Sequence, residues 1–333
     1  MTQSHVLVTG GAGYVGSALV PKLLAEGHKV TVLDLYLYGD GVRIFPLCND
    51  HPDLRQIKGD LRDRATVRAA LEGVDTVIHL ACISNDPSYD LDPELGRSIN
   101  YDAFRPLIRD AKAAGVKRFI FASSSSVYGV KDVPEVTETL PLEPLTDYSR
   151  FKALCEQELL DEREPGFVVC IIRPSTVCGY APRQRLDVVV NIFANQAVGT
   201  GRIRVTGGAQ KRPNIHIDDM SAVYLHLLRQ PDEKIDGKIW NAGDTNYTVA
   251  DLAALVRKVI GPQVEIETVP TNDPRSYHVS GKKIRDDIGF ELSHTIEEAV
   301  KGVADAISDG RLIDPLNNPL YFNIKQMQLL KLK

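Results

Sequence analysis

Several marks of secreted, disulfide-bonded or membrane-spanning chains are missing from this sequence of 333 residues. The cysteines are odd in number, at five, and widely spaced, and no two form a CxxC pair, which argues against a disulfide framework and a zinc site. No run of about 18 apolar residues occurs, and no basic flank with a short apolar stretch opens the chain. We therefore expect reduced thiols, no metal site, no secretion, no membrane insertion and a cytoplasmic location.

The sequence also lacks a basic run, and its 39 lysines and arginines are outnumbered by 44 aspartates and glutamates. The net charge of -5 makes nucleic acid and anionic membranes unlikely partners, so an anionic ligand would need local donors. With 43% hydrophobic and 25% charged residues, the composition is that of an ordinary globular chain. The length allows about two domains, at roughly 150 residues each.

Short β-branched apolar runs alternate with helical patterns along the first half of the chain. Alternation of this kind is typical of βαβ units on a parallel sheet. The sequence therefore predicts an α/β fold with six parallel strands, enough for a doubly wound sheet of the Rossmann type. The expected strands are 5–9, 29–34, 54–60, 75–81, 118–124 and 168–175, and the expected helices are 14–26, 64–72, 95–114 and 147–162.

The second half has a different texture, with basic and glycine-rich loops after Pro174 and shorter elements. A helix is expected at about 188–197. A further helix within 214–230 and a strand at 238–244 should return to the first sheet. Thr248, with Asp251 three residues later, predicts the capped start of another helix.

Glycines fill the turn between the first expected strand and the first expected helix. Gly11, Gly13 and Gly16 form a G-x-G-x-x-G pattern. Glycine is needed there where the turn is tight and a diphosphate must approach bare backbone. The next strand ends at Asp34, whose carboxylate can accept hydrogen bonds from both hydroxyls of an adenosine ribose. The pattern therefore predicts a bound dinucleotide.

Asp34 also discriminates between cofactors, because its charge would repel a 2′-phosphate. The residues that follow it, 35–38, read Leu-Tyr-Leu-Tyr and offer no arginine to neutralise one. We therefore expect NAD rather than NADP. Asp60 and Leu61 follow the third strand and should lie near the adenine, although capping of the strand end is the alternative. His79 lies inside an apolar strand, which favours a core histidine.

Tyr148 and Lys152 are four residues apart on an expected helix and therefore share one face. A nearby ammonium stabilises a phenolate and makes tyrosine a usable base. The spacing alone is not specific, since Tyr321 and Lys325 repeat it in the C-terminal tail. Only Tyr148 follows the fifth strand, whose carboxyl end carries four serines at 123–126, at the edge where doubly wound sheets bind ligands. We therefore expect Tyr148 and Lys152 to be catalytic.

Five motifs then point to one family: TGGAGYVG (9–16), GDLRD (59–63), FASSSSVYG (121–129), YSRFK (148–152) and RPSTVCG (173–179). Together they resemble the extended short-chain dehydrogenase/reductase family of NAD-dependent nucleotide-sugar epimerases and dehydratases, in register from residue 5 to about 290. The resemblance implies Ser124 as the catalytic serine and a homodimer packed through paired helices. The cofactor-binding residues expected from pattern and resemblance together are Gly10, Gly13, Tyr14, Val15, Gly16, Asp34, Asp60, Leu61, Leu80, Ala81, Tyr148 and Lys152.

Domain boundaries follow from the same reading. Residues 1–175 should form the NAD-binding domain, rejoined by about 214–244. Residues 176–213 and 245–333 should form a smaller C-terminal α/β lobe that binds substrate.

Substrate contacts rest on fewer features. The resemblance equates Arg212 and Arg275 with arginines that grip a substrate diphosphate, although both could be solvated surface residues. Thr176 stands where the family usually has asparagine. The loop with Ser84 and Asn85 follows the fourth strand and could either select the sugar or form an ordinary turn. Ser125, next to the catalytic serine, is also expected to face substrate.

The expected activity is inversion of one sugar carbon, C4, of a nucleotide-diphosphate sugar by transient oxidation and re-reduction. Dehydratases of the family place an Asp-Glu pair directly after the catalytic hydroxyl residue, whereas this chain has Ser125 and Ser126. A serine hydroxyl cannot do general acid work alone near neutral pH. The alternatives are a nucleotide 4-keto-sugar reductase, then a dehydratase, or a non-catalytic NAD-sensing regulator on the same fold.

Overall fold

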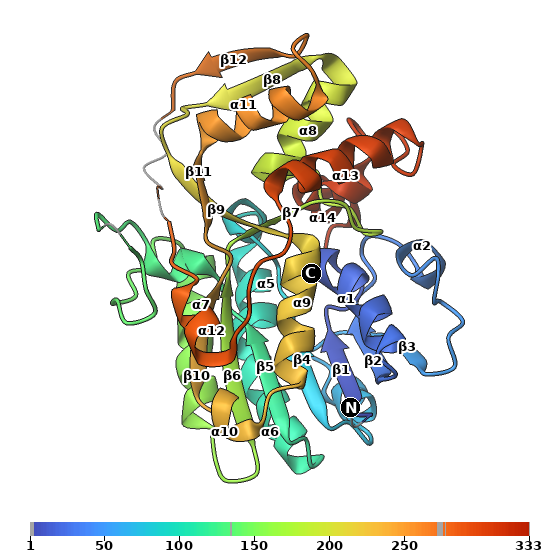
Figure 1. The fold of residues 1–333 in the computed structure, drawn as a ribbon. Helices are drawn as coiled ribbons and strands as arrows, with labels where there is room; N and C mark the ends of the chain where they lie inside the picture. The colour runs from blue at the N-terminus through green and yellow to red at the C-terminus, as the bar shows by residue number, and fades with distance from the viewer. Residues whose placement is uncertain (1–2, 134, 272–275, 277, 333) are drawn as a thin grey trace.

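The computed structural model describes residues 3–133, 135–271, 276 and 278–332, and a parallel sheet runs through its centre (Figure 1). Seven strands lie in the order β10-β6-β5-β4-β1-β2-β3, and every neighbouring pair is parallel. The expected Rossmann-type sheet is therefore confirmed, including the late strand that returns to it. The strands are β1 His5–Thr9, β2 Lys29–Asp34, β3 Leu54–Lys58, β4 Thr76–His79, β5 Arg118–Ala122, β6 Val168–Pro174 and β10 Lys238–Ala242.

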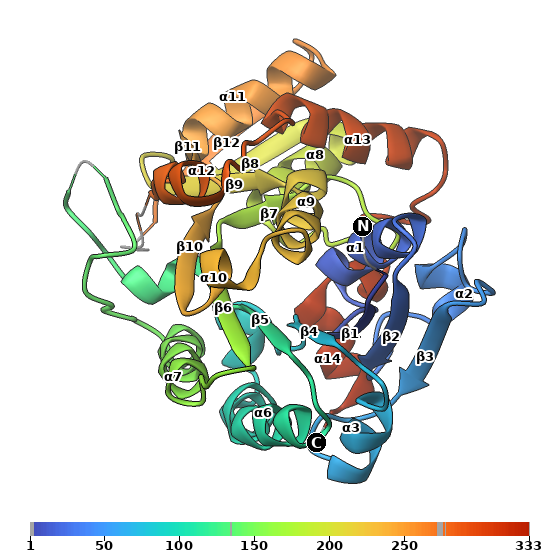
Figure 2. The same ribbon diagram turned by 60° about the horizontal axis from the view of Figure 1, so that its bottom comes forward.

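Helices cover both faces of this sheet, which explains why its strands read as continuous apolar runs. Figure 2 shows α1 and α9 on one side and α3, α6 and α7 on the other. Each layer buries its own apolar cluster against the strands, so the sheet is the middle of three layers. The helices are α1 Tyr14–Ala25, α3 Arg64–Ala70, α6 Phe104–Ala113, α7 Asp147–Asp161 and α9 Ile217–Leu228.

A smaller group of elements packs around a separate apolar cluster above the carboxyl edge of the sheet (Figure 1). It holds a three-stranded sheet, β11-β9-β7, and a parallel pair, β12-β8. The capping box of Thr248 and Asp251 opens α11 as expected. The elements are β7 Thr176–Cys178, β8 Arg202–Thr206, β9 Lys211–His216, β11 Thr245–Thr248, β12 Glu265–Val269, α8 Val189–Thr200, α11 Val249–Ile260 and α13 Ile296–Ser308. The proposed division of the chain into two domains stays a prediction.

Short helices complete the fold, and one of them changes an expectation. The helix expected over 95–114 is divided into α5, a π-helical turn η1, and α6. In η1 the Asn100 amide bonds both backbone groups of Ile83, at 2.7 Å to its N–H and 3.0 Å to its C=O. The short helices are α2 Gly41–Ile44, α4 Asp86–Tyr89, α5 Pro93–Arg97, η1 Ser98–Asp102, η2 Ser125–Tyr128, α10 Asp232–Ile235, α12 Lys282–Ile288, η3 Pro319–Tyr321 and α14 Asn323–Leu330.

Two further sequence expectations can be compared with the structure. His79 is 3% exposed among the rings of Phe104, Phe119 and Phe121, and its Nδ1 lies 2.7 Å from the Thr9 hydroxyl. The reading of His79 as a core histidine is therefore confirmed. All five cysteines are free. Within the described ranges, none of the helices combines the length and apolarity that crossing a membrane requires.

Candidate active site

A cavity of about 340 Å³ lies at the carboxyl edge of the seven-stranded sheet. This is the edge at which doubly wound sheets bind ligands. The cavity brings together residues that are far apart in the sequence and that the sequence analysis singled out, although their roles stay predictions. Those that line it are Gly10, Gly13, Tyr14, Val15, Gly16, Asp34, Asp60, Leu61, Leu80, Ala81, Ser84, Asn85, Ser124, Ser125, Tyr148, Lys152 and Thr176.

The glycine turn brings the start of α1 to the cavity wall. Gly10 has φ +71°, and a Cβ there would lie 2.6 Å from the Ala81 backbone, so the turn packs against the segment after β4 only because it is glycine. Gly13 is the N-cap of α1, and no side chain caps the free N–H groups that follow it. A helix N-terminus of this kind attracts anions. The turn therefore fits the diphosphate of a dinucleotide.

Asp34 ends β2 with its carboxylate at the cavity. The carboxylate accepts the N–H of Ala12 at 3.0 Å and the N–H of Tyr36 at 2.7 Å, and these bonds fix its orientation. Burial raises the pKa of Asp34, while the N–H groups of Tyr36 and Ala12 and the charge of Arg183 oppose that rise. The remaining acceptor capacity of the carboxylate suits ribose hydroxyls.

Arg183 is a cavity residue that the sequence analysis missed. It comes from the loop before α8, and its guanidinium carbon lies 3.6 Å from the centre of the Tyr38 ring. Its Nη2 donates to Asn323 Oδ1 at 2.5 Å, while Nε and Nη1 are buried without a partner among the described residues. Burial lowers the pKa of Arg183. Each unmet buried donor costs about 1–3 kcal/mol, so this guanidinium is suited to a ligand acceptor.

Asp60 follows β3 and forms a forked ion pair with Arg62, whose Nη2 lies 2.7 Å from Asp60 Oδ2. Burial would raise the pKa of Asp60, but the bonds from Arg62 outweigh it and lower that pKa. Part of the carboxylate is therefore used within the protein. The alternative, that Asp60 serves to cap the strand end, agrees with these bonds and leaves its cofactor role a prediction.

Several serine hydroxyls lie close together in the segment after β5. Ser124 is the N-cap of η2, and its Oγ accepts the N–H of Ser126 at 3.1 Å and lies 2.9 Å from the Ser126 Oγ. Ser123 instead donates to Glu156, which pairs with Arg173 at 2.6 Å inside the core. This buried pair connects α7 with β5 and β6, and therefore holds the tyrosine helix against the serine strand.

Tyr148 lies in the first turn of α7, which a capping box between Thr146 and Ser149 begins. Burial raises the pKa of Tyr148 well above its ordinary value, and Cys82 and Asp86 add to the rise. The charge of Arg185 and a hydrogen bond with Ser124 act in the opposite direction. The phenol is therefore protonated at neutral pH unless further positive charge approaches.

Lys152, one turn of α7 after Tyr148, reaches the end of β5. Its ammonium donates to the Ala122 carbonyl at 2.6 Å and lies 4.8 Å from the centre of the Phe121 ring. Both contacts direct it to the end of β5, at the floor of the cavity. Arg185 is the cation whose charge counts most among those lowering the Tyr148 pKa.

Arg185 is the second cavity residue that the sequence analysis missed. Its Nε donates to Asp187 Oδ1 at 2.8 Å, its Nη1 lies 3.4 Å from the Ser84 Oγ, and its Nη2 is buried without a partner among the described residues. The signal in the sequence was the basic loop GYAPRQR at 179–185. Nothing in the sequence indicated where that loop would lie.

The expected substrate residues are only partly brought together. Ser84, Asn85, Ser125 and Thr176 line the cavity, and Asn85 holds φ +71° with ψ 157°, a conformation that costs a non-glycine residue roughly 1–3 kcal/mol. Arg212 lies on β9 and is absent from the described lining, with its Nη1 on the Lys211 carbonyl at 2.9 Å. Arg275 lies outside the described residues.

The second tyrosine-lysine pair has no part in the described cavity wall. Tyr321 is 2% exposed, and its hydroxyl accepts bonds from Arg43 at 3.2 Å and from the N–H of Ile313 at 3.1 Å. Lys325 lies over the Phe322 ring. Both residues therefore have structural surroundings.

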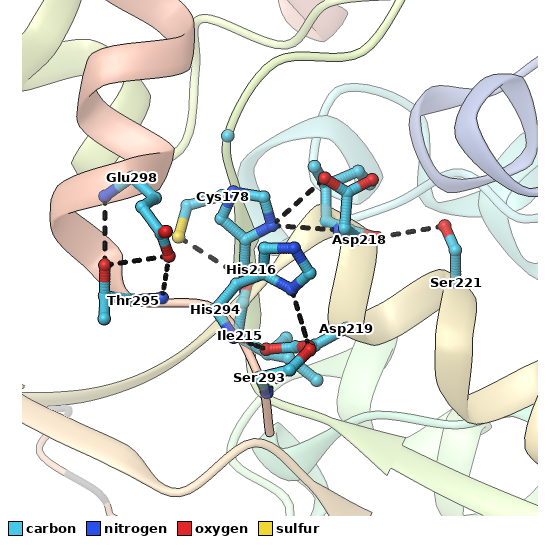
Figure 3. A network of polar contacts seen from close by, with 12 residues as sticks. Cys178, Ile215, His216, Asp218, Asp219, Ser221, Ser293, His294, Thr295 and Glu298 are labelled. Carbon is cyan, nitrogen blue, oxygen red and sulfur yellow. Dashed lines mark hydrogen bonds and ion pairs between the residues drawn. The ribbon is translucent and has the colours of Figure 1, made fainter. Parts of the chain in front are cut away.

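A polar cluster where α9 begins has the residue types of a metal site (Figure 3). Ligand atoms of His216, Asp218 and His294 lie within 4.8 Å of one another. The two imidazole rings are nearly parallel, at 14° and 4.7 Å between centres, so their in-plane lone pairs do not converge on one ion. His216 Nδ1 accepts the Asp218 N–H, and the Asp218 carboxylate binds Lys22 at 2.6 Å.

The neighbouring Asp219 explains what this cluster does. Its buried carboxylate accepts the N–H groups of Ser293 and His294, each at 3.0 Å, and lies 2.9 Å from His294 Nδ1. Burial would raise the pKa of Asp219, but the bonds from His294 and Ser293 lower it. The cluster therefore ties the start of α9 to the segment before α13, as Figure 3 shows.

Comparison with known proteins agrees with this geometry. A sequence model described as the NAD dependent epimerase/dehydratase family matches residues 6–243. A UDP-glucose 4-epimerase of Lactobacillus helveticus is 26% identical over 312 residues, which are 87% of this chain and 92% of that protein. An uncharacterized protein of Sinorhizobium fredii is 33% identical over 223 residues, 66% of this chain, and the chain spans only 52% of that relative's length.

Among solved structures, DesIV, a dTDP-glucose 4,6-dehydratase of Streptomyces venezuelae with NAD and TYD bound, superposes with a TM-score of 0.84. It is 26% identical, and the match covers 94% of this chain and all of that one. The relatives thus include both an epimerase and a dehydratase.

Proposed function

Because the chain belongs to the NAD-dependent epimerase/dehydratase family, we propose that it is a nucleotide-sugar epimerase that inverts one sugar carbon, C4. One observation supports this choice over dehydration. The cavity places Tyr148 and Ser124 together, while the two positions after Ser124 carry hydroxyl groups. The chain thus has groups for moving a hydroxyl proton and no acid pair at the dehydratase position.

NAD is the cofactor, and when bound it supplies reversible oxidation of the sugar carbon. The residues of the cavity fit it, since the uncapped start of α1 at Gly13 suits a diphosphate and Asp34 suits a ribose. Lys152 and Tyr148 lie toward β5, on the far side of β4 from the glycine turn. The cofactor would therefore extend along the carboxyl edge of the sheet.

Tyr148 acts in this proposal as the base that removes the proton from the C4 hydroxyl and later returns it. Ser124, which touches Tyr148, donates a hydrogen bond to the same oxygen while it has carbonyl character. Burial favours the protonated phenol, so the phenolate would depend on the charge of Arg185 together with the positive charge of the oxidised nicotinamide when NAD is bound. The proton that leaves the substrate comes back to it, so the reaction is redox-neutral.

The same residues argue against dehydration. Removing water from a sugar requires one group to deprotonate C5 and another to protonate the leaving hydroxyl. Ser125 is 4% exposed, and the Ser126 Oγ lies within hydrogen-bond distance of the Ser124 Oγ, at 2.9 Å. Neither hydroxyl titrates near neutral pH, so neither can supply this acid and base chemistry alone.

The test is incubation of the purified enzyme in deuterated water with UDP-glucose or dTDP-glucose and no added cofactor, followed by NMR. We expect the C4 epimer to accumulate, with no net NADH absorbance and no deuterium on any sugar carbon. Deuterium at C5 or a 4-keto-6-deoxy product would reject the proposal in favour of a dehydratase. Stoichiometric oxidation of added NAD(P)H with a 4-keto substrate would establish the reductase instead.

A further inference from the structure

The C-terminal helix α14 joins three separate segments of the cavity wall. Leu37 lies in the segment that follows β2, and its carbonyl accepts a hydrogen bond from Gln326 at 2.6 Å. Ser84 lies in the segment that follows β4, and its hydroxyl accepts a hydrogen bond from the Asn323 side chain at 2.9 Å. The backbone N–H of Asn323 donates to Asp187, in the segment before α8, at 2.8 Å. Leu37, Ser84 and Asn323 all line the cavity. The helix is drawn in red beside the sheet in Figure 2.

The strand order indicates what lies beneath this helix. β2 and β4 are the two neighbours of β1 in the sheet. A helix bonded to the segments after both strands must therefore pass over the carboxyl end of β1. That end carries the glycine turn and the start of α1, where a diphosphate fits.

Apolar contacts anchor the same helix. Met327 is 6% exposed and packs with Ile83, Leu95 and Ile99 in a small cluster of its own. Ile83 and Ile99 also line the cavity. The cluster holds α14 on the β4 side, while Gln326 holds it on the β2 side.

Asn323 also fixes the position of Arg183. The guanidinium is clamped between the Tyr38 ring and the Asn323 side chain, with two of its nitrogens buried and unpartnered. A cation that is 4% exposed and has no carboxylate bonded to it in the described structure needs an acceptor from elsewhere. An anionic group over the glycine turn would supply one.

We propose that Arg183 is a ligand of the NAD diphosphate, that Asn323 positions it, and that α14 is a clasp that must open for the cofactor to leave. The diphosphate would lie between the glycine turn on one side and Arg183 on the other. Bound NAD would thus neutralise the buried Arg183 guanidinium, and α14 would be closed while NAD is bound. This inference concerns cofactor retention and holds whichever sugar reaction the enzyme performs.

The test measures NAD affinity by titration calorimetry and NAD release by rapid dilution into excess competing cofactor. Arg183→Met should weaken NAD binding at least tenfold, because a charge-assisted bond is lost. Asn323→Ala and Gln326→Ala should release NAD several-fold faster. Asn323→Asp would give Arg183 a carboxylate partner within the protein and set a negative charge beside the diphosphate, so it should also weaken NAD binding. Gln328→Ala, an exposed glutamine on the same helix, should match the unmodified protein.

A merely structural role for α14 gives a different result. Variants at 323 and 326 would then lower the melting temperature of the NAD-free protein but leave NAD affinity and release unchanged, which would overturn the proposal. A chain ending at Phe322 provides a second measurement, with faster release expected. If that chain does not fold, the point variants decide. Equal NAD affinity in the Arg183→Met and unmodified proteins would also overturn the assignment of Arg183.

Discussion

Tyr148 illustrates what a spacing of four residues can and cannot predict. Helical geometry placed Lys152 on the same face as Tyr148, and both residues do line one cavity. The ammonium nevertheless bonds Ala122, and Arg185, from a loop 37 residues further along the chain, acts on the phenol. A helix pattern contains no information about a loop that approaches from outside it.

Replacing Tyr148 by phenylalanine removes the expected base and keeps the ring. We expect turnover to fall by about 10²–10⁴, the usual range for a positioned acid or base, with NAD affinity unchanged. Steady-state kinetics and NAD titration measure the two quantities. Tyr321→Phe is the matched control and should keep full turnover. The reverse pattern would show that the wrong tyrosine has been assigned.

The environment of Tyr148 also predicts a pH effect for Arg185. A base must be ionised to act, and the charge of Arg185 lowers the Tyr148 pKa. Arg185→Met should therefore raise that pKa and move the acidic limb of the kcat profile to higher pH. Arg185→Lys should move it less, because the charge is kept. Arg202→Met, at an exposed position of β8, is the control and should leave the profile unchanged. An unshifted acidic limb in Arg185→Met would show that Arg185 does not control the Tyr148 pKa.

Asp34 supports the preference for NAD. Asp34→Ala should weaken NAD binding by roughly 1.5–3 kcal/mol, or about 10–150-fold, because hydrogen bonds to a charged acceptor are lost. NADP binding should become less unfavourable in the same variant, because the charge that repels the 2′-phosphate is removed. Asp40→Ala, an exposed carboxylate after the same strand, should change neither affinity. Stronger binding of NADP than NAD by the unmodified protein would contradict the argument from this carboxylate.

At the scale of elements, local signals predicted most of the first half of the chain. β1 and β2 occupy the ranges expected from their apolar runs, and Thr248 with Asp251 marks the start of α11. The division of 95–114 by η1 was not predictable, because it depends on the Asn100 amide meeting Ile83 from another segment. The β8–β12 pair was missed for a similar reason, since 58 residues lie between the two strands and β12 is largely exposed.

His79 in β4 should make the sheet sensitive to acid. Burial, with the charge of Lys152, lowers its pKa to about 3, whereas the unfolded chain keeps a value near 6.5. Between these values the unfolded state binds the extra proton, so stability falls as pH falls through this window. At pH 5 the loss relative to pH 7 should be about 2 kcal/mol from this residue, at about 1.4 kcal/mol per pH unit below 6.5.

Urea unfolding at several pH values measures that loss. His79→Phe removes the titrating group and should flatten the dependence between pH 6.5 and 4.5 by about this amount, whatever its effect on stability at pH 7. His28→Phe, a substitution at a buried histidine outside the sheet strands, is the matched control. An unchanged slope in His79→Phe would show that folding does not lower the pKa of His79.

At the scale of the whole molecule, the cavity depends on segments that the sequence keeps far apart. Arg183, Arg185 and Asn323 reach it from the second half of the chain, and only the basic character of one loop hinted at them. Residues near the glycine turn could be predicted because the motif itself fixes their spacing. Residues that reach the cavity from segments remote in the sequence could not, because their positions depend on tertiary contacts such as the bond from Asn323 of α14 to Ser84.

The expected homodimer can be tested on the α6 and α7 face, which these two helices form together on one side of the sheet (Figure 2). Leu154 is 41% exposed on α7, on the same stripe as Arg150 and Gln157. A second copy packed through paired helices would cover this leucine and make its burial favourable. Light scattering should then give about twice the chain mass of 36.7 kDa.

Leu154→Glu would place a negative charge on the α7 surface of both copies, where the two charges would repel, and should shift the protein toward monomer. Leu47→Glu, at a 95% exposed site after α2, is the control and should remain dimeric. If Leu47→Glu dissociated the dimer and Leu154→Glu did not, the interface would not lie on α7.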